Sequence, residues 1–136
     1  MTAPLLDTHA WIWWIGADPR LRRSEAGWLD ALPPGERPYL SDISLWEATM
    51  LAAERRLTLS PSVAEWLEAA AHPRTVQILR ITPAIAAETA ALPASFGKDP
   101  ADRIIVATSR VLNVPLLTHD RAILRSKLVK HWTPPA

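Results

Sequence analysis

The 136-residue sequence predicts a single three-layer α/β domain, in which helices cover both faces of a parallel sheet of short strands. Short apolar segments alternate with helical patterns along the chain, which is typical of this fold class. No segment is joined to the next by a hairpin turn, so neighbouring strands are expected to run parallel. Strands that are apolar throughout suit a sheet buried on both faces. The expected domain spans residues 1–136.

The first half of the chain is expected to hold two strands and four helices. Gly16 closes the first helix, which is apolar nearly all round. Ser41 or Asp42 can cap the third helix, and Ser60 can cap the fourth with Pro61 at its first position. The ranges, in order, are strand 4–6, helices 8–15 and 20–32, strand 38–40, and helices 43–56 and 61–72.

The second half continues the alternation of strands and helices. Thr82 and Asp99 each precede a proline, a pair that typically opens a helix, and Asn113 ends the longest helix. The ranges, in order, are strand 76–81, helices 83–92 and 100–112, strand 114–118, helix 121–126 and strand 128–132.

Composition excludes several classes of protein. The chain has no cysteine, which excludes a disulfide framework and a thiolate metal site. Its longest apolar run, 10–15, is too short to cross a bilayer, and no basic region precedes it, so we expect a cytoplasmic protein without a membrane segment. Net charge is only +1, but residues 121–136 carry four basic residues and no acid. This tail is either a solvated surface or a patch that contacts phosphates.

Two aspartates follow expected strands. Asp7 ends PLLD and Asp120 ends PLLTHD. In open parallel sheets ligands bind beyond the carboxyl ends of the strands, so both side chains are expected at that edge. Each aspartate can instead cap the helix that follows it.

A glutamate and two further aspartates lie on or beside helices. Glu47 shares its helix face with apolar residues, where a carboxylate needs a partner or a metal ion; a salt bridge to a distant arginine is the alternative. Asp99 and Asp102, in KDPADR, resemble a capping box, but a helix needs only one cap, and Asp102 can point to the edge that carries Asp7.

The acids are more informative together than singly. Carboxylates about 4 Å apart at an effective dielectric constant of about 20 repel by roughly 4 kcal/mol per pair. A cluster of them must therefore bind protons or a cation. Oxygen ligands without cysteine favour a hard ion, Mg²⁺ or Mn²⁺, and such an ion with open positions suits phosphoryl chemistry.

Four motifs resemble the PIN-domain ribonucleases, and most closely the VapC-like toxins of bacterial toxin–antitoxin modules. They are LLDTH, S-x-x-S-L-W-E, DP-x-DR and LLT-x-D, and the resemblance spans about residues 4–132. It implies endonucleolytic cleavage of RNA that depends on Mg²⁺ or Mn²⁺. It also implies a homodimer and a cognate antitoxin, whose C-terminal segment lies in an apolar groove and often places an arginine among the acids.

The resemblance assigns roles to residues. It implies that Asp7 and Asp102 ligate the metal directly, whereas Glu47 and Asp120 complete the shell through water or orient the nucleophile. The further residues expected to support the site are Asp99, Thr118, Ser44 and Arg103. The candidates for RNA contact are Lys98, Arg121, Arg125, Lys127 and Lys130. Where the family often has histidine and arginine before DP, this chain has Gly97-Lys98.

Other aromatic residues admit two interpretations. His9 and His119 flank the expected site, either as hydrogen-bonded structural residues or as phosphate contacts. Trp11, Trp13 and Trp14 crowd one helix, which is covered either by the core or by a second copy of the chain.

Two rival functions keep the fold but change the chemistry. A phospho-receiver or phosphatase-like domain also has acids at strand ends, but the first strand here ends in D-T-H rather than D-x-D, and arginine rather than lysine follows LLTHD. A catalytically inactive interaction domain is the other alternative, and the presence of all four acids argues against it.

Overall fold

The computed structural model describes residues 3–135, so residues 1, 2 and 136 of the expected domain lie outside the described part. Four strands form one parallel sheet in the order β3-β2-β1-β4. They are β1 (Leu5–Leu6), β2 (Tyr39–Ser41), β3 (Gln77–Leu79) and β4 (Leu116–Leu117). The α/β class and the parallel sheet expected from the sequence are therefore confirmed.

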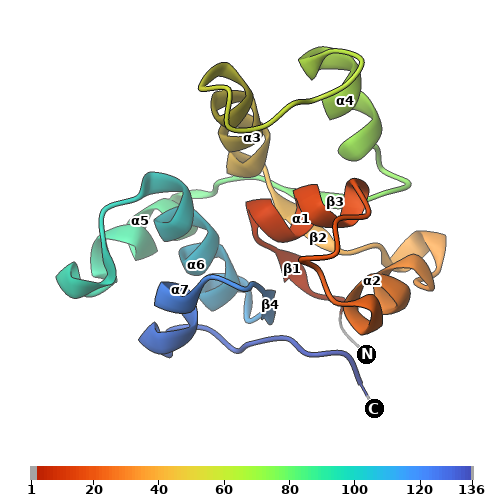
Figure 1. Ribbon diagram of the computed structural model, residues 1–136. Helices are drawn as coiled ribbons and strands as arrows, with labels where there is room; N and C mark the ends of the chain where they lie inside the picture. The colour runs from red at the N-terminus through yellow and green to blue at the C-terminus, as the bar shows by residue number, and fades with distance from the viewer. Residues whose placement is uncertain (1–2, 136) are drawn as a thin grey trace.

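Seven α-helices and two short 3-10 helices surround this sheet within residues 3–135 (Figure 1). The α-helices are α1 (Thr8–Ile15), α2 (Arg23–Asp30), α3 (Ile43–Ala53), α4 (Val63–Ala70), α5 (Pro83–Ala91), α6 (Pro100–Leu112) and α7 (Arg121–Ser126). The 3-10 helices are η1 (Pro34–Glu36) and η2 (Ala94–Phe96).

Strands β1 and β4 each give one leucine to each face of the sheet. Leu6 and Leu117 belong to a core formed with α1, α2, α3 and α4, whereas Leu5 and Leu116 belong to a core formed with α6 and α7. The side-chain period of two in a strand produces this division. In Figure 1 α5, α6 and α7 accordingly gather away from α1 and α2, with the strands between them. The layers are helix, sheet and helix.

The tryptophan-rich helix α1 is covered within the chain itself. Trp11 is fully buried, its indole N–H donates to the carbonyl of Ala70 (2.9 Å), and its ring meets Trp66 of α4 at 4.9 Å between centroids. A second copy of the chain is therefore not needed to cover Trp11.

Several element ends differ from the sequence-based expectation. α2 is shorter than 20–32, although Leu21 before it is buried. α3 stops at Ala53 rather than Arg56, because Arg55 adopts a left-handed backbone (φ 58°) that ends the helix. The expected strand 128–132 is wrong apart from an isolated bridge between Leu116 and His131.

One expected helix cap is wrong, and the cap of α3 combines the two residues expected for it. Ser62, not Ser60, caps α4, and its hydroxyl accepts from the amide of Glu65 (3.1 Å). Asp42 occupies the N-cap position of α3, but its Oδ2 accepts from the amide of Ile81 (3.2 Å). The hydroxyl of Ser41 accepts from the amide of Ile43, the first residue of α3 (3.3 Å). Within residues 3–135, no helix combines the length and the hydropathy that a membrane span requires.

Burial of Trp11 predicts a large difference between two tryptophan variants. Trp11→Ala should lower the free energy of unfolding by about 3–5 kcal/mol, because it leaves a cavity between α1 and α4. Trp46→Ala, on a side chain that is 52% exposed, should change it by about 0.5 kcal/mol or less. Urea unfolding measures both. Equal losses would contradict this description of the core.

Candidate active site

Four carboxylates from four elements line one cavity of about 280 Å³. Asp7 follows β1, Glu47 lies on α3, Asp102 lies in the first turn of α6 and Asp120 precedes α7. The parallel order places β1 beside β4, so the acids that follow these two strands meet at one edge of the sheet. The structure thus brings together residues that are up to 113 positions apart in the sequence (120 − 7).

The two strand-end aspartates cap helices and line the cavity at once. Oδ1 of Asp7 accepts from the amide of Ala10 (2.8 Å), and Oδ1 of Asp120 accepts from the amide of Ile123 (3.0 Å). The sequence posed capping and site lining as alternatives, but each carboxylate oxygen has two lone pairs, so the roles are compatible.

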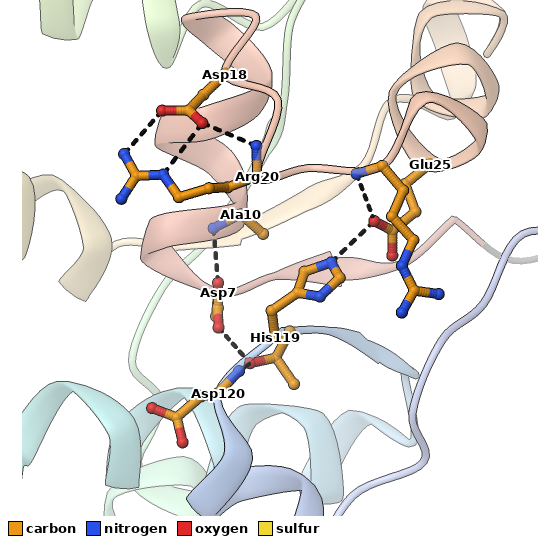
Figure 2. Close-up of polar contacts among 9 residues, drawn as sticks. Asp7, Ala10, Asp18, Arg20, Glu25, His119 and Asp120 are labelled. Atoms are coloured by element: carbon orange, nitrogen blue, oxygen red, sulfur yellow. Dashed lines mark hydrogen bonds and ion pairs between the residues drawn. The ribbon is translucent and has the colours of Figure 1, made fainter.

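Thr118 links Asp7 and Asp120, which are both labelled in Figure 2. Its hydroxyl donates to Oδ2 of Asp7 and accepts from the backbone N–H of Asp120 (3.0 Å). Thr118 is fully buried and directly follows β4, so this link fixes the strand-end turn relative to β1. The hydroxyl that the sequence placed beside the last acid therefore contacts the first acid.

Within the described residues, the four cavity acids form no ion pair, although Arg20 and two histidines line the same cavity. Among residues 3–135, the ion pairs join Arg20 to Asp18, Arg110 to Glu88 and His119 to Glu25, and none includes the four cavity acids. The distant-arginine alternative for Glu47 therefore finds no support in the described chain.

Three of the four cavity acids, Asp7, Glu47 and Asp102, have a pKa above the ordinary value for a carboxyl. Burial raises the pKa of Asp7 and of Glu47, and nearby carboxylates add to both effects. Burial, followed by the charges of Asp99, Asp120, Glu47 and Asp7, raises the pKa of Asp102 to about 7. A cation in the cavity would relieve this repulsion.

The remaining site candidates from the sequence fall into two groups. Asp99 caps α6 through the amide of Asp102 (3.0 Å) and lines a neighbouring cavity with Glu47, so it lies close to the acids. Ser44 is buried and shares a hydrogen bond with Thr8 (2.9 Å), which supports the wall of the site. Arg103 turns away, because its guanidinium donates to the carbonyls of Gly97, Thr89 and Leu92.

The basic residues expected to contact RNA lie outside the acid cavity. All of them are exposed, and none lines it: Lys98, Arg121, Arg125, Lys127 and Lys130. They stay a prediction.

Sequence reasoning missed four residues near the site: Thr8, Trp13, Arg20 and Glu25. Arg20 lines the acid cavity, and Glu25 is buried with its Oε1 against Nε2 of His119 (2.8 Å). Figure 2 shows the contact between Glu25 and His119, and the side chain of Arg20 bound to Asp18, in the same view as Asp7. Glu25 and His119 are 94 positions apart, so no local sequence pattern predicts their contact. The sequence could show only that a buried glutamate on an amphipathic helix requires some partner.

Comparison with known proteins identifies the family. Residues 5–127 match the model of the PIN domain. The chain belongs to the PIN-domain family. A relative of this PIN domain, Ribonuclease VapC22 of Mycobacterium tuberculosis (strain ATCC 25618 / H37Rv), is 39% identical over 124 residues, which cover 90% of this chain and 91% of the relative.

Solved structures share the fold of this PIN domain. A toxin–antitoxin complex from Klebsiella pneumoniae superposes with a TM-score of 0.64 at 24% identity, and the match covers 98% of each chain. FitAcB from Neisseria gonorrhoeae gives a TM-score of 0.66 at 26% identity, and the match covers 96% of each chain. The first of these likenesses supports the fold alone.

The raised pKa of Asp102 predicts how folding stability depends on pH without metal. The folded state keeps a proton that the unfolded state releases above its pKa of 3.8, so this group's contribution falls as pH rises from about 4 to 7. In EDTA at pH 8, Asp102→Asn should raise Tm by a few degrees and flatten this dependence. The exposed Glu36→Gln is the control. A lower Tm for Asp102→Asn at pH 8 would refute the repulsion.

Proposed function

We propose that this PIN domain is a divalent-metal-dependent endoribonuclease of the VapC type and the toxin component of a toxin–antitoxin pair, with the whole chain acting as one nuclease domain. The observation that carries the proposal is the convergence of four unpaired carboxylates in one cavity. The identity with a VapC ribonuclease supports it independently. Membership of the PIN family is inconsistent with the receiver and phosphatase alternatives.

The donor set fits Mg²⁺ or Mn²⁺. Within the described residues, no group of three or more acidic or histidine side chains is placed to hold an ion by itself. Mg²⁺ usually keeps several waters and takes only one or two protein carboxylates, so a complete protein cage is not required. Asp7 and Asp102 would hold the ion directly, with Glu47 and Asp120 acting through water.

The chain's own residues prepare the site for a phosphodiester. A bound Mg²⁺ would activate a water molecule and offset the charge of the phosphate. Thr118 and the amide of Ala10 hold Asp7 in one orientation. Oδ1 of Asp120 is held by Ile123, and its other oxygen is left to accept from a water molecule. These bonds fix the carboxylates before substrate arrives, which lowers the cost of organising the site.

An isosteric change of Asp7 tests the metal site and the chemistry. Mg²⁺ or Mn²⁺ should raise the Tm of the wild type, because an ion that binds only the folded state stabilises it. Asp7→Asn keeps an acceptor for the Ala10 amide but removes a charge, so it should abolish the Tm response and slow RNA cleavage by about 100-fold or more.

The cleavage assay uses purified protein, several RNAs, and Mg²⁺ or EDTA. Glu36→Gln should behave as the wild type in both assays. Intact RNA in every tube, together with the same ion response in Asp7→Asn, would favour the inactive interaction domain.

A second cavity, beside the acid cavity, suits the proposed antitoxin partner. This cavity of about 350 Å³ shares His9, Trp13 and Arg20 with the acid cavity. Its apolar lining is Ile12, Leu51, Leu57, Leu59 and Trp66. An antitoxin segment with apolar side chains and one terminal cation would fill this groove and reach the acids. The Klebsiella neighbour is itself a toxin–antitoxin complex.

A bulky charge in that groove should block the partner. Thr58 is exposed and lines the cavity, so Thr58→Arg should leave the fold intact and abolish co-purification with the product of the small reading frame beside the toxin's own. Arg74→Gln, outside both cavities, should co-purify as the wild type does. Undiminished co-purification of Thr58→Arg would exclude the groove as the contact.

A homodimer also stays a proposal. Its support is now the exposed apolar side chains rather than α1, whose Trp11 is covered within the chain. The most exposed of these are Trp46 (52%), Leu112 (43%) and Ile78 (41%).

A further inference from the structure

One wall of the acid cavity is formed by aromatic rings and a guanidinium rather than by acids. His9 and Trp13 come from α1, and their ring centroids are 5.9 Å apart. The ring centroid of His119, from the β4–α7 turn, is 6.0 Å from that of Trp13, and both histidine rings are tilted to the indole, by 51° for His9 and 45° for His119. The guanidinium of Arg20 lies over the Trp13 ring at 5.0 Å from its centroid. All four side chains line the cavity that holds the acids, and we name them the stacking wall.

Each outer member of the stacking wall is held by a second residue. Arg20 donates to Asp18 through Nε (3.1 Å), Nη2 (2.8 Å) and its backbone N–H (2.9 Å). His119 is held by buried Glu25, whose Oε1 lies 2.8 Å from Nε2 of the imidazole ring. The planes are therefore preorganised, and ordering them on binding costs little.

The charge balance of the stacking wall favours a base over a phosphate. Asp18 offsets the charge of Arg20, and that hydrogen-bonded contact lowers the pKa of Asp18 to about 2. Because its charge is offset, the Arg20 guanidinium offers a ligand mainly a flat stacking surface, which packs on the Trp13 indole, and it is less suited to bind a phosphate. Its side chain is 68% exposed, so the outer plane is accessible. Proteins that recognise single-stranded RNA stack unpaired bases on aromatic rings and on arginine planes of this kind.

We propose that the stacking wall of His9, Trp13, Arg20 and His119 is a nucleobase subsite, which receives an unstacked base next to the scissile phosphate of a single-stranded RNA. The subsite rests on the proposed ribonuclease function, because the acids and the wall share one cavity. Arg20 and Trp13 supply the stacking surface, and the acids opposite act on the phosphate. The substrate class is single-stranded RNA, since a paired base is not free to stack there.

Two small probes separate the base from the phosphate. AMP and ribose 5-phosphate are titrated into ¹⁵N-labelled protein with Mg²⁺, and the indole N–H signals are followed; the Trp13 signal is assigned by its absence in Trp13→Phe. AMP should bind about tenfold or more tightly than ribose 5-phosphate, the scale of one stacked base, and should shift the Trp13 signal.

Variants of the stacking wall should remove this preference for the base. Arg20→Gln and Trp13→Leu should bring the two affinities to within about threefold of each other, whereas Arg74→Gln should leave the ratio unchanged. Arg20 is exposed, so its variant keeps the fold even if Trp13→Leu does not. Equal binding of the two probes by the wild type, or an unchanged ratio in Arg20→Gln, would overturn the subsite.

The same titration distinguishes this proposal from the function on which it rests. Repeating it in EDTA leaves the base preference in place if the stacking wall is correct, because stacking needs no ion. Failure of the ribonuclease proposal would instead appear as an absence of any effect of Mg²⁺ on the affinity for ribose 5-phosphate, together with uncleaved RNA.

Discussion

The repulsion among four carboxylates in one cavity is the constraint on which the other features of the site depend. None of Asp7, Glu47, Asp102 and Asp120 is paired with a base in the described chain, and burial with mutual repulsion raises the pKa of Asp102 to about 7. Folding therefore pays an electrostatic cost at neutral pH. The large apolar core, with fully buried leucines on both faces of the sheet, offsets that cost. A cation bound in the cavity would offset this cost, which would link ion binding to the stability of the site.

The fold explains why acids so far apart in the sequence meet. The paired strands β1 and β4 are only two residues long, and each ends at the edge where its aspartate caps the next helix. Short strands suffice because both faces are covered by helices, so each leucine is buried. The helices α3 and α6 then bring Glu47 and Asp102 to the same edge. Helix capping and site construction thus use the same side chains, and Thr118 fixes their relation.

The sequence predicted the parallel sheet, most helices and the convergence of the four acids, because periodicity, caps and strand-end position are local signals. The sequence pattern misplaced the cap of α4. It also predicted a strand at 128–132 from alternating hydrophobicity, a pattern that does not show whether a neighbouring strand is available; in the structure this segment forms only one isolated bridge to β4. The sequence could not show that Arg103 binds carbonyls, nor that Glu25 holds His119 and Arg20 covers Trp13. These contacts join segments whose approach only the tertiary fold determines. Asp7, Asp99 and Asp120, which the sequence allowed as helix caps, do cap helices. Asp7 and Asp120 also line the acid cavity, and Asp99 lines the cavity beside it. For these residues, capping a helix and lining the site were therefore not true alternatives.

A crystal structure of the wild type soaked in Mn²⁺, with anomalous scattering recorded for manganese, tests the central claim most directly. An anomalous peak inside the cavity, about 2.0–2.2 Å from a carboxylate oxygen of Asp7 or Asp102, is the predicted result. The account would be contradicted if no manganese bound in the cavity and the four carboxylates were instead protonated or paired with rearranged basic side chains.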